Sequence, residues 1–202
     1  MTVPGRVEAA ALLLSLGPPA WLLRHSRGVA EVAGWLAMQV VIAGGPVDRA
    51  RVEAAALLHD VDKTLPPADP ARSLPHGEGS AAWLRRLGHA ELGPAVAAHP
   101  VTRLTEEDAD AWLAGAPLED RIVAYADKRV GQRLQSMDER FASWRRRYPG
   151  SWTATEAAAA VARARRLESG VCAAAAVEPA AVRRLRWTGP ALRGAHDASA
   201  GR

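Results

Sequence analysis

Residues 56–66 read ALLHDVDKTLP, and in this stretch a run of small apolar residues leads directly into ionisable side chains. His59 and Asp60 follow the apolar run, Lys63 lies about one helical turn further on, and Pro66 interrupts the helix. A buried carboxylate is costly unless a cation or hydrogen bonds compensate its charge. The stretch therefore predicts a buried helix whose end places His59 and Asp60 in a polar pocket.

The composition of the whole chain predicts an all-α fold. Hydrophobic residues make up 49% of the 202 residues but aromatic residues only 5%, so Ala, Leu and Val must build the core. Alanine is the best helix former, and runs of the residues that favour β-strands are nearly absent. The length suits one domain with a well-filled core.

Apolar residues repeat at helical spacing along most of the chain, with Pro and Gly between the repeats. Val29, Val32 and Leu36, for example, form one stripe of a helix. Thr105 is followed by three acidic residues and predicts the start of a short helix, because such side chains satisfy free amides there. The other helices that we expect cover about 5–16, 21–42, 47–60, 77–88, 91–99 and 118–131, with another to about 148 and one from about 151.

The charge and the cysteine content restrict the function classes. The net charge is +4 and the isoelectric point is about 10.0, which suits ligands that carry phosphate, although solvated helix faces account for most of it. The single cysteine, Cys172, excludes a disulfide within the chain and suits a reducing compartment. No segment reaches the roughly 18 apolar residues of a membrane span. We therefore expect a cytoplasmic protein that does not bind a membrane.

Four further ionisable residues stand at comparable places in other predicted helices. One lies early in its helix, one enters a helix, one ends a helix, and one lies on an apolar helical face: His25, His76, His99 and Asp127. Helix ends of this kind could converge on one pocket. Imidazole and carboxylate together suit Fe, Mn, Zn, Co or Ni better than Ca or Mg, which prefer oxygen ligands. Local spacing alone leaves a metal site only suggested.

The ordered set resembles the HD superfamily of metal-dependent phosphohydrolases. Its members here are His25, the pair His59–Asp60, His76, His99 and Asp127. They stand in the segments RHSRGVAEVAGWLA (24–37), AALLHDVDK (55–63), HGEGSAAWL (76–84), AAHP (97–100) and YADKRV (125–130). The resemblance covers roughly residues 20–135. A His–Asp dipeptide alone is a weak signal, whereas six positions in the right order and helical settings are a strong one.

The resemblance implies a helical bundle with a dinuclear metal site at its converging helix ends. One divalent transition-metal ion would be held by His25, His59, Asp60 and Asp127. Asp60 would bridge to a second ion, held also by His76 and His99. Members with only the first four positions tend to be mononuclear. Iron is the favoured metal in such relatives, with Mn, Zn, Co and Ni as alternatives. The two remaining histidines, His89 in a turn and His196 near the end of the chain, are excluded.

The resemblance also implies a mechanism, in which a hydroxide bridging the two ions attacks phosphorus in line. Asp60 and Lys63 are the expected catalytic residues, and Lys63 would stabilise the developing charge or the leaving group. Asp62 could pair with Lys63 or face solvent, and we favour solvent. Further basic residues are candidates for contacts with other phosphates: Arg103, Lys128, Arg129 and Arg133.

The expected function is hydrolysis of a phosphoester or phosphoanhydride bond in a small nucleotide-type substrate. A dinucleoside polyphosphate or a nucleoside phosphate is favoured. The alternative is an HD scaffold used for binding or regulation, with little or no turnover. A third hypothesis, nucleic-acid binding through Arg145–Arg147, is disfavoured, because no aromatic residues alternate with basic ones there. The tryptophans recur at apolar helical positions and are interpreted as core residues.

The resemblance and the change in composition after Gly150 suggest three parts of the chain. We expect a metal-dependent phosphohydrolase domain of the HD type over residues 1–150 and a helical extension over 151–187. The extension is alanine-rich and chemically bland, and it could cap the bundle, cover the site mouth or contact a second copy in a homo-oligomer. Residues 188–202 are expected to be a disordered tail.

Overall fold

The computed structural model describes residues 3–201, and within this range it contains ten α-helices and no β-strand. The all-α prediction is therefore confirmed. One isolated β-bridge joins Val130 to Leu134. Among the described helices, none combines the length and the apolar character needed to cross a membrane. The helices are α1 (Arg6–Ser15), α2 (Ala20–Ile42), α3 (Arg49–Leu58), α4 (Glu78–Arg86), α5 (Gly93–Ala97), α6 (Ala109–Gly115), α7 (Leu118–Arg129), α8 (Met137–Arg147), α9 (Ala154–Ala174) and α10 (Thr188–Ala200).

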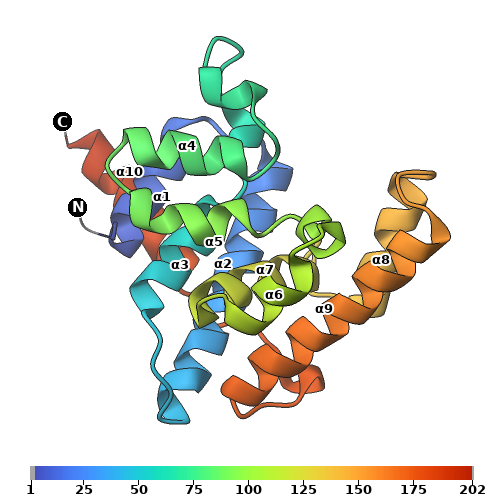
Figure 1. The fold of residues 1–202 in the computed structure, drawn as a ribbon. Helices are drawn as coiled ribbons and strands as arrows, with labels where there is room; N and C mark the ends of the chain where they lie inside the picture. The colour runs from blue at the N-terminus through green and yellow to red at the C-terminus, as the bar shows by residue number, and fades with distance from the viewer. Residues whose placement is uncertain (1–2, 202) are drawn as a thin grey trace.

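Helix α2 forms the centre of the bundle, with α3 and α7 packed against it (Figure 1). The predicted stripe of Val29, Val32 and Leu36 is fully buried. The facing part of α3 is built from alanines, and residues 54–56 are all buried. Short side chains let helices approach closely, so an alanine-rich sequence can fill this core with few aromatic residues.

Gly28 of α2 lies where the end of α7 approaches it. A Cβ atom built on Gly28 would lie only 2.7 Å from Cγ1 of Val130, so a larger residue would push the two elements apart. His25 precedes Gly28 by three residues, and Asp127 precedes Val130 by three residues. The close approach at Gly28 therefore helps to bring His25 and Asp127 together.

Thr105 does not begin a helix, and this prediction is wrong. Thr105 ends the 3-10 helix η4 (Val101–Thr105), where its Oγ1 donates a hydrogen bond to the carbonyl oxygen of Thr102 at 2.7 Å. Helix α6 begins later, at Ala109. The threonine hydroxyl is satisfied within its own turn and is not used to cap the amides that follow.

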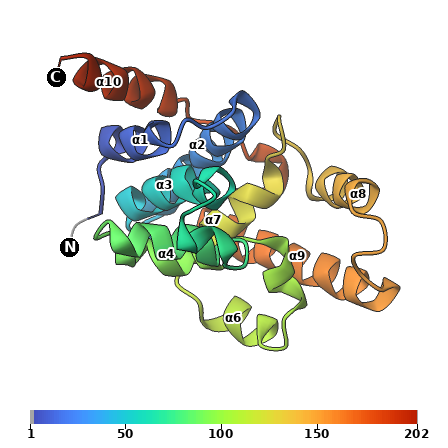
Figure 2. The same ribbon diagram turned by 90° about the horizontal axis from the view of Figure 1, so that it is seen from above.

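Helices α8 and α9 lie next to each other at one side of the bundle, beyond α7 (Figures 1 and 2). Each begins with a capping box, formed by Ser136 with Glu139 in α8 and by Thr153 with Glu156 in α9. Helix α9 is tied to α7 through a buried hydrogen bond from Tyr125 Oη to Glu168 Oε1 at 3.0 Å. These two helices are therefore fixed parts of the fold.

Residues 188–200 form helix α10, which corrects the prediction of a disordered tail. Helix α10 packs along α1, so the last helix covers the first (Figure 2). Its inner face buries Ala191, Leu192 and Ala195. The sequence gives little sign of this helix, because only a few small apolar side chains are buried and the rest of the segment is polar.

Glu31 of α2 connects α10 to the bundle. Its carboxylate accepts hydrogen bonds from the backbone N–H of Arg186 at 2.7 Å and from Thr188 Oγ1 at 2.6 Å. Beside it, Trp187 Nε1 donates to the carbonyl oxygen of Ala30 at 3.1 Å. The Glu31 side chain is buried, so both of its oxygens depend on these partners.

We expect Glu31→Gln to lower the free energy of unfolding by about 1–3 kcal/mol, because the amide cannot accept both bonds and leaves a buried donor unsatisfied. Hydrogen exchange of the amides in residues 188–200 should also become faster. The matched control is Glu107→Gln, an exposed residue, which should change stability by less than about 0.5 kcal/mol. Equal exchange in both variants would mean that Glu31 does not hold α10.

Candidate metal centre

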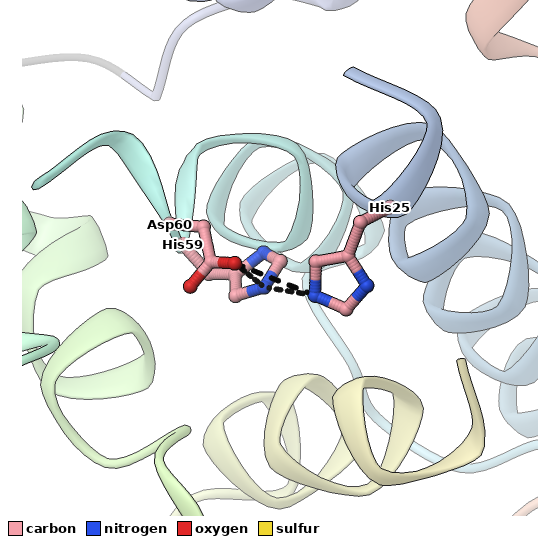
Figure 3. A group of neighbouring side chains, drawn as sticks. All are labelled: His25, His59 and Asp60. Atoms are coloured by element: carbon pink, nitrogen blue, oxygen red, sulfur yellow. Dashed lines mark hydrogen bonds and ion pairs between the residues drawn. The ribbon is translucent and has the colours of Figure 1, made fainter. Parts of the chain in front are cut away.

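Six ionisable side chains from separate parts of the fold converge at one place. They are His25 from α2, His59 and Asp60 at the end of α3, His76 before α4, His99 after α5 and Asp127 from α7. Figure 3 shows three of them, with the His25 ring reaching from α2 toward His59 and Asp60. Five of the six are buried, and His76 is partly open to solvent. The structure thus brings together every metal ligand predicted from the sequence.

Asp60 lies between two pairs of histidines, and each of its oxygens faces one pair. Oδ2 lies 3.4 Å from His25 Nε2 and 3.5 Å from His59 Nε2. Oδ1 lies 3.3 Å from His76 Nε2 and 3.4 Å from His99 Nε2. The ligand atoms in each half of the cluster all lie within 4.8 Å of one another. This arrangement matches two adjacent cation sites that share one carboxylate.

Asp127 completes the first half of the cluster. Its Oδ1 lies 3.1 Å from His25 Nε2 and 3.8 Å from His59 Nε2. The first half therefore offers two imidazoles and two carboxylates, whereas the second half offers two imidazoles and Asp60.

Backbone carbonyl groups set the tautomers of the buried histidines. Nδ1 of His59 lies 2.8 Å from the carbonyl oxygen of Ala56, and Nδ1 of His99 lies 2.6 Å from that of Val96. A carbonyl oxygen only accepts, so in each neutral ring Nδ1 carries the proton and Nε2 presents a lone pair. Nδ1 of His25 faces the carbonyl oxygen of Gly131 at 3.3 Å and follows the same rule.

The lone pairs point at one another inside the cluster. Nε2 of His25 lies 3.2 Å from Nε2 of His59, and Nε2 of His76 lies 3.1 Å from Nε2 of His99. Unprotonated nitrogens at such distances repel each other unless a cation binds both. In addition, Asp60 Oδ1 is buried and pairs with the ammonium of Lys63 at 2.7 Å, so a cation already compensates this side of the carboxylate. The residues present therefore fit divalent transition-metal ions, which take neutral imidazole and carboxylate ligands.

The charges of the cluster agree with this interpretation. Burial lowers the pKa of His59 to about 3, so this ring is neutral in the physiological range. Burial alone would raise the pKa of Asp60, but the imidazole of His59 and the ammonium of Lys63 hold it well below its usual range. Burial would likewise raise the pKa of Asp127, but His25, the guanidinium of Arg140 and His59 together hold it well below its usual range. Both carboxylates of the cluster thus stay ionised, and the His59 ring between them is neutral.

Lys63 stands at the edge of the cluster. Its Nζ lies 2.7 Å from each oxygen of Asp60, donating a hydrogen bond to Oδ2 and forming an ion pair with Oδ1, and its side chain is partly exposed. Lys63 also lines the cavity in front of the cluster, together with His25, His76 and Asp127. The structure therefore places Lys63 where it can meet a group that enters the cavity.

Asp62 does not face solvent, which corrects the favoured interpretation. Its Oδ2 accepts hydrogen bonds from His76 Nδ1 at 2.9 Å and from the backbone N–H of Gly77 at 2.8 Å. Burial would raise the pKa of Asp62, but His76 and the backbone N–H of Gly77 together lower it further than burial raises it. The α-helix ends at Leu58 and residues 61–64 form a 3-10 helix, so the side chain of Asp62 does not point where a continued α-helix would place it.

Asp62→Ala should weaken binding of the ion on the His76 side by about 10- to 100-fold, because Asp62 fixes the tautomer and the orientation of that ring. The ion on the His25 side should bind as before. Calorimetric titration of the chelator-treated protein with Mn²⁺ would resolve the two affinities. The matched control is Glu78→Ala, which removes an exposed carboxylate close to the same loop. If Asp62→Ala and Glu78→Ala bound both ions alike, Asp62 would have no positioning role.

Lys128 and Arg129 do not reach the cavity, although each was predicted to bind phosphate. Lys128 is fully buried, and its Nζ donates to the carbonyl oxygens of His99 at 2.9 Å and Ala124 at 3.2 Å. Burial lowers the pKa of Lys128 to about 8. Arg129 is also buried, and it donates to Tyr125 Oη at 2.5 Å and to carbonyl oxygens on two other segments. The structure thus corrects both predictions, since these two cations hold the backbone together.

Arg103 and Arg133 also lie outside the cavity lining. Arg103 forms ion pairs with Glu106 and Asp108, and Arg133 is exposed and pairs with Glu139 at 3.2 Å. The basic residues that do line the cavity are Lys63, Arg140 and Arg145. Arg140 and Arg145 stand in α8, beyond the segment that carries the resemblance. Arg145 belongs to the basic run 145–147 noted in the sequence, whereas nothing in the sequence pointed to Arg140.

A cavity of about 1000 Å³ lies in front of the cluster. Besides the cluster residues, its lining includes aromatic side chains between residues 141 and 152: Phe141, Trp144, Tyr148 and Trp152. The interpretation of the tryptophans as core residues therefore holds for Trp35 and Trp83, which are buried, and is wrong for Trp21, which is exposed. Trp144 and Trp152 pack against the core and also line the cavity. Apolar spacing alone cannot separate the wall of a cavity from a core.

A family model described as the HD domain matches residues 22–130 of the chain. The matched segment contains all six residues of the cluster and ends before α8. No match was found among curated proteins or among solved structures. Residues 131–201, which supply α8, α9 and the aromatic lining of the cavity, lie outside the matched segment.

Proposed function

The chain belongs to the HD domain family, and on this premise we propose that it is a metal-dependent phosphohydrolase with a dinuclear centre. The observation that supports the proposal most strongly is the position of Asp60, whose two oxygens face separate pairs of histidines at 3.3–3.5 Å. Such a carboxylate suits a bridge between two cations, and paired cations suit hydrolysis of phosphate bonds.

Two divalent ions held there would act as Lewis acids, which polarise phosphoryl oxygens and lower the pKa of a water molecule. The protein itself sets the protonation of the ligand nitrogens and supplies a further positive charge. The carbonyl groups that bind Nδ1 of His59 and His99 keep the other ring nitrogens unprotonated. Lys63 brings a positive charge to the edge of the cavity, where it would stabilise charge that develops on a phosphoryl group or on the leaving group.

We further propose that the substrate is a small nucleotide-type phosphate, with a nucleoside phosphate or a dinucleoside polyphosphate favoured. The cavity volume of about 1000 Å³ lies at the upper end of the range for small-molecule sites. Lys63, Arg140 and Arg145 give its lining a positive charge that suits phosphate groups. The alternative of an HD scaffold without turnover has less support, because all six ligand positions are present and converge.

A panel of phosphate esters and nucleotides would test this proposal. The protein would be loaded with Fe²⁺ or Mn²⁺, and released phosphate would be measured for nucleoside monophosphates, dinucleoside polyphosphates and simple sugar phosphates. We expect hydrolysis of at least one nucleotide by the wild type and none by Asp60→Asn. If the wild type and this variant gave the same rates on every compound, the scaffold alternative would replace the proposal.

A further inference from the structure

One wall of the cavity is built by α8 and by the first half of α9. These helices lie side by side past the end of α7 (Figure 2). We define the aromatic wall as Phe141, Trp144, Tyr148 and Trp152, all of which line the cavity. The same cavity is lined by His25, Lys63, His76 and Asp127, so the aromatic wall and the metal centre share one continuous space. A molecule whose phosphate lay at the metal centre would extend along this wall.

The rings of the aromatic wall are held in a defined arrangement. Phe141 is buried and meets Trp144 edge to face, with ring centroids 5.0 Å apart and planes at 86°. Trp152 lies on the other side of the α8–α9 turn, with its ring 6.5 Å from that of Phe141. The buried Phe141 ring therefore packs against both tryptophan rings. Trp144 and Trp152 themselves are only partly buried, so part of each ring remains free to contact a ligand.

Arg140 joins the aromatic wall to the metal centre. Its guanidinium carbon lies 4.5 Å from the centroid of the Trp144 ring, within the range of a cation–π interaction. The same guanidinium reaches toward Asp127, with Nη2 at 3.7 Å from Oδ1, and its Nε donates to the carbonyl oxygen of Asp127 at 3.4 Å. The wall is thus fixed relative to a residue of the cluster.

Small side chains keep the space beside the aromatic wall open. Helix α9 lines the cavity with residues at helical spacing, namely Ala154, Ala157, Ala158, Val161 and Ala162. Several of these alanines are exposed, whereas Ala160 and Ala164 of the same helix are buried. An apolar lining that includes tryptophan rings and two arginines suits a planar ring that carries polar atoms.

We propose that the aromatic wall binds the planar aromatic group of the substrate by stacking on Trp144 and Trp152, and so determines specificity. This inference rests on the proposed function, because it places the phosphate of the same molecule at the metal centre. It assigns the recognition of the organic group to residues 141–152, which lie outside the segment shared with the HD domain family. Arg140 is a positioning residue for the wall.

Adenosine is a suitable probe, because it has a planar base and no phosphate and cannot be hydrolysed by this chemistry. Its binding to the full-length protein as purified would be followed by tryptophan fluorescence and by calorimetry. We expect saturable binding to the wild type, and affinities about 5- to 150-fold weaker for Trp144→Ala and for Trp152→Ala. Trp144→Phe should retain most of the affinity, because it keeps an aromatic ring. The matched control is Trp21→Ala, since Trp21 is exposed and lies outside the cavity lining.

A second measurement separates this inference from the proposed function. Once a hydrolysed nucleotide is known, KM would be compared between that nucleotide and ribose 5-phosphate. Trp144→Ala should raise KM for the nucleotide and leave KM for ribose 5-phosphate unchanged. Hydrolysis without adenosine binding, and with equal KM values in the wild type and Trp144→Ala, would overturn the inference and leave the proposed function intact. Adenosine binding that depends on the tryptophans, without hydrolysis of any phosphate, would support the proposal that the aromatic wall binds a planar ring. The same result would contradict the proposed phosphohydrolase function.

Discussion

Asp60→Asn is expected to abolish retention of both metal ions and to lower kcat by about 10³-fold or more. The reason is geometric, since Asp60 is the one carboxylate whose oxygens face both halves of the cluster. Lewis-acid stabilisation is worth several kcal/mol in metal-dependent hydrolysis, and each 1.4 kcal/mol corresponds to about a tenfold change in rate. Asparagine keeps the shape of the side chain, so the fold should persist and the thermal transition should remain cooperative.

Metal content after gel filtration and the hydrolysis rate of the same sample would be measured together. Asp197→Asn is the matched control, because Asp197 is exposed on α10 and the variant makes the same chemical change. The control should keep its metal and its rate. An Asp60→Asn protein that retained both ions and turned over normally would show that Asp60 is not the shared ligand.

Lys63→Met is expected to lower kcat by about 10²- to 10³-fold without loss of metal. Removal of one group that stabilises charge in a transition state has an effect of this size. Methionine retains the length of the apolar stem, so the packing of the 3-10 turn at residues 61–64 should be preserved. The ammonium contacts Asp60 but is not itself a ligand, and the bound ions would still compensate the carboxylate.

The Lys63→Met variant distinguishes a catalytic role of Lys63 from a purely structural role. Arg146→Met, which removes an exposed cation from α8, should change neither kcat nor metal content. Loss of metal from Lys63→Met would mean that the lysine maintains the cluster. An unchanged kcat would mean that Lys63 does not contact the reacting phosphate.

The ligand set could be predicted from the sequence because its signal is local. His59 and Asp60 end a visibly apolar helix, and the other four residues stand in a fixed order within or next to helices that their apolar spacing reveals. The two pairings of histidines around Asp60 could not be predicted. They depend on how closely α2 and α7 approach at Gly28 and on the carbonyl groups that hold each Nδ1, which are tertiary features.

The predictions that were wrong also failed because they depend on tertiary features. Lys128 follows Asp127 in sequence, but one residue along a helix turns the side chain by about 100°, and Lys128 points into the protein. Asp62 is redirected toward His76 because the α-helix ends before it. Helix α10 was missed because it buries only a few small apolar side chains, and the aromatic wall was missed because apolar spacing does not separate the wall of a cavity from a core.

Metal analysis of the protein, purified without chelators, tests the central claim most directly. Atomic emission measurements on the folded chain, with protein quantified in the same sample, should find about two transition-metal ions per chain, and chelation should remove them together with any hydrolytic activity. A folded protein that contained no transition metal, and that took up none when Fe²⁺, Mn²⁺ or Zn²⁺ was supplied, would contradict the claim that the six side chains form a dinuclear centre.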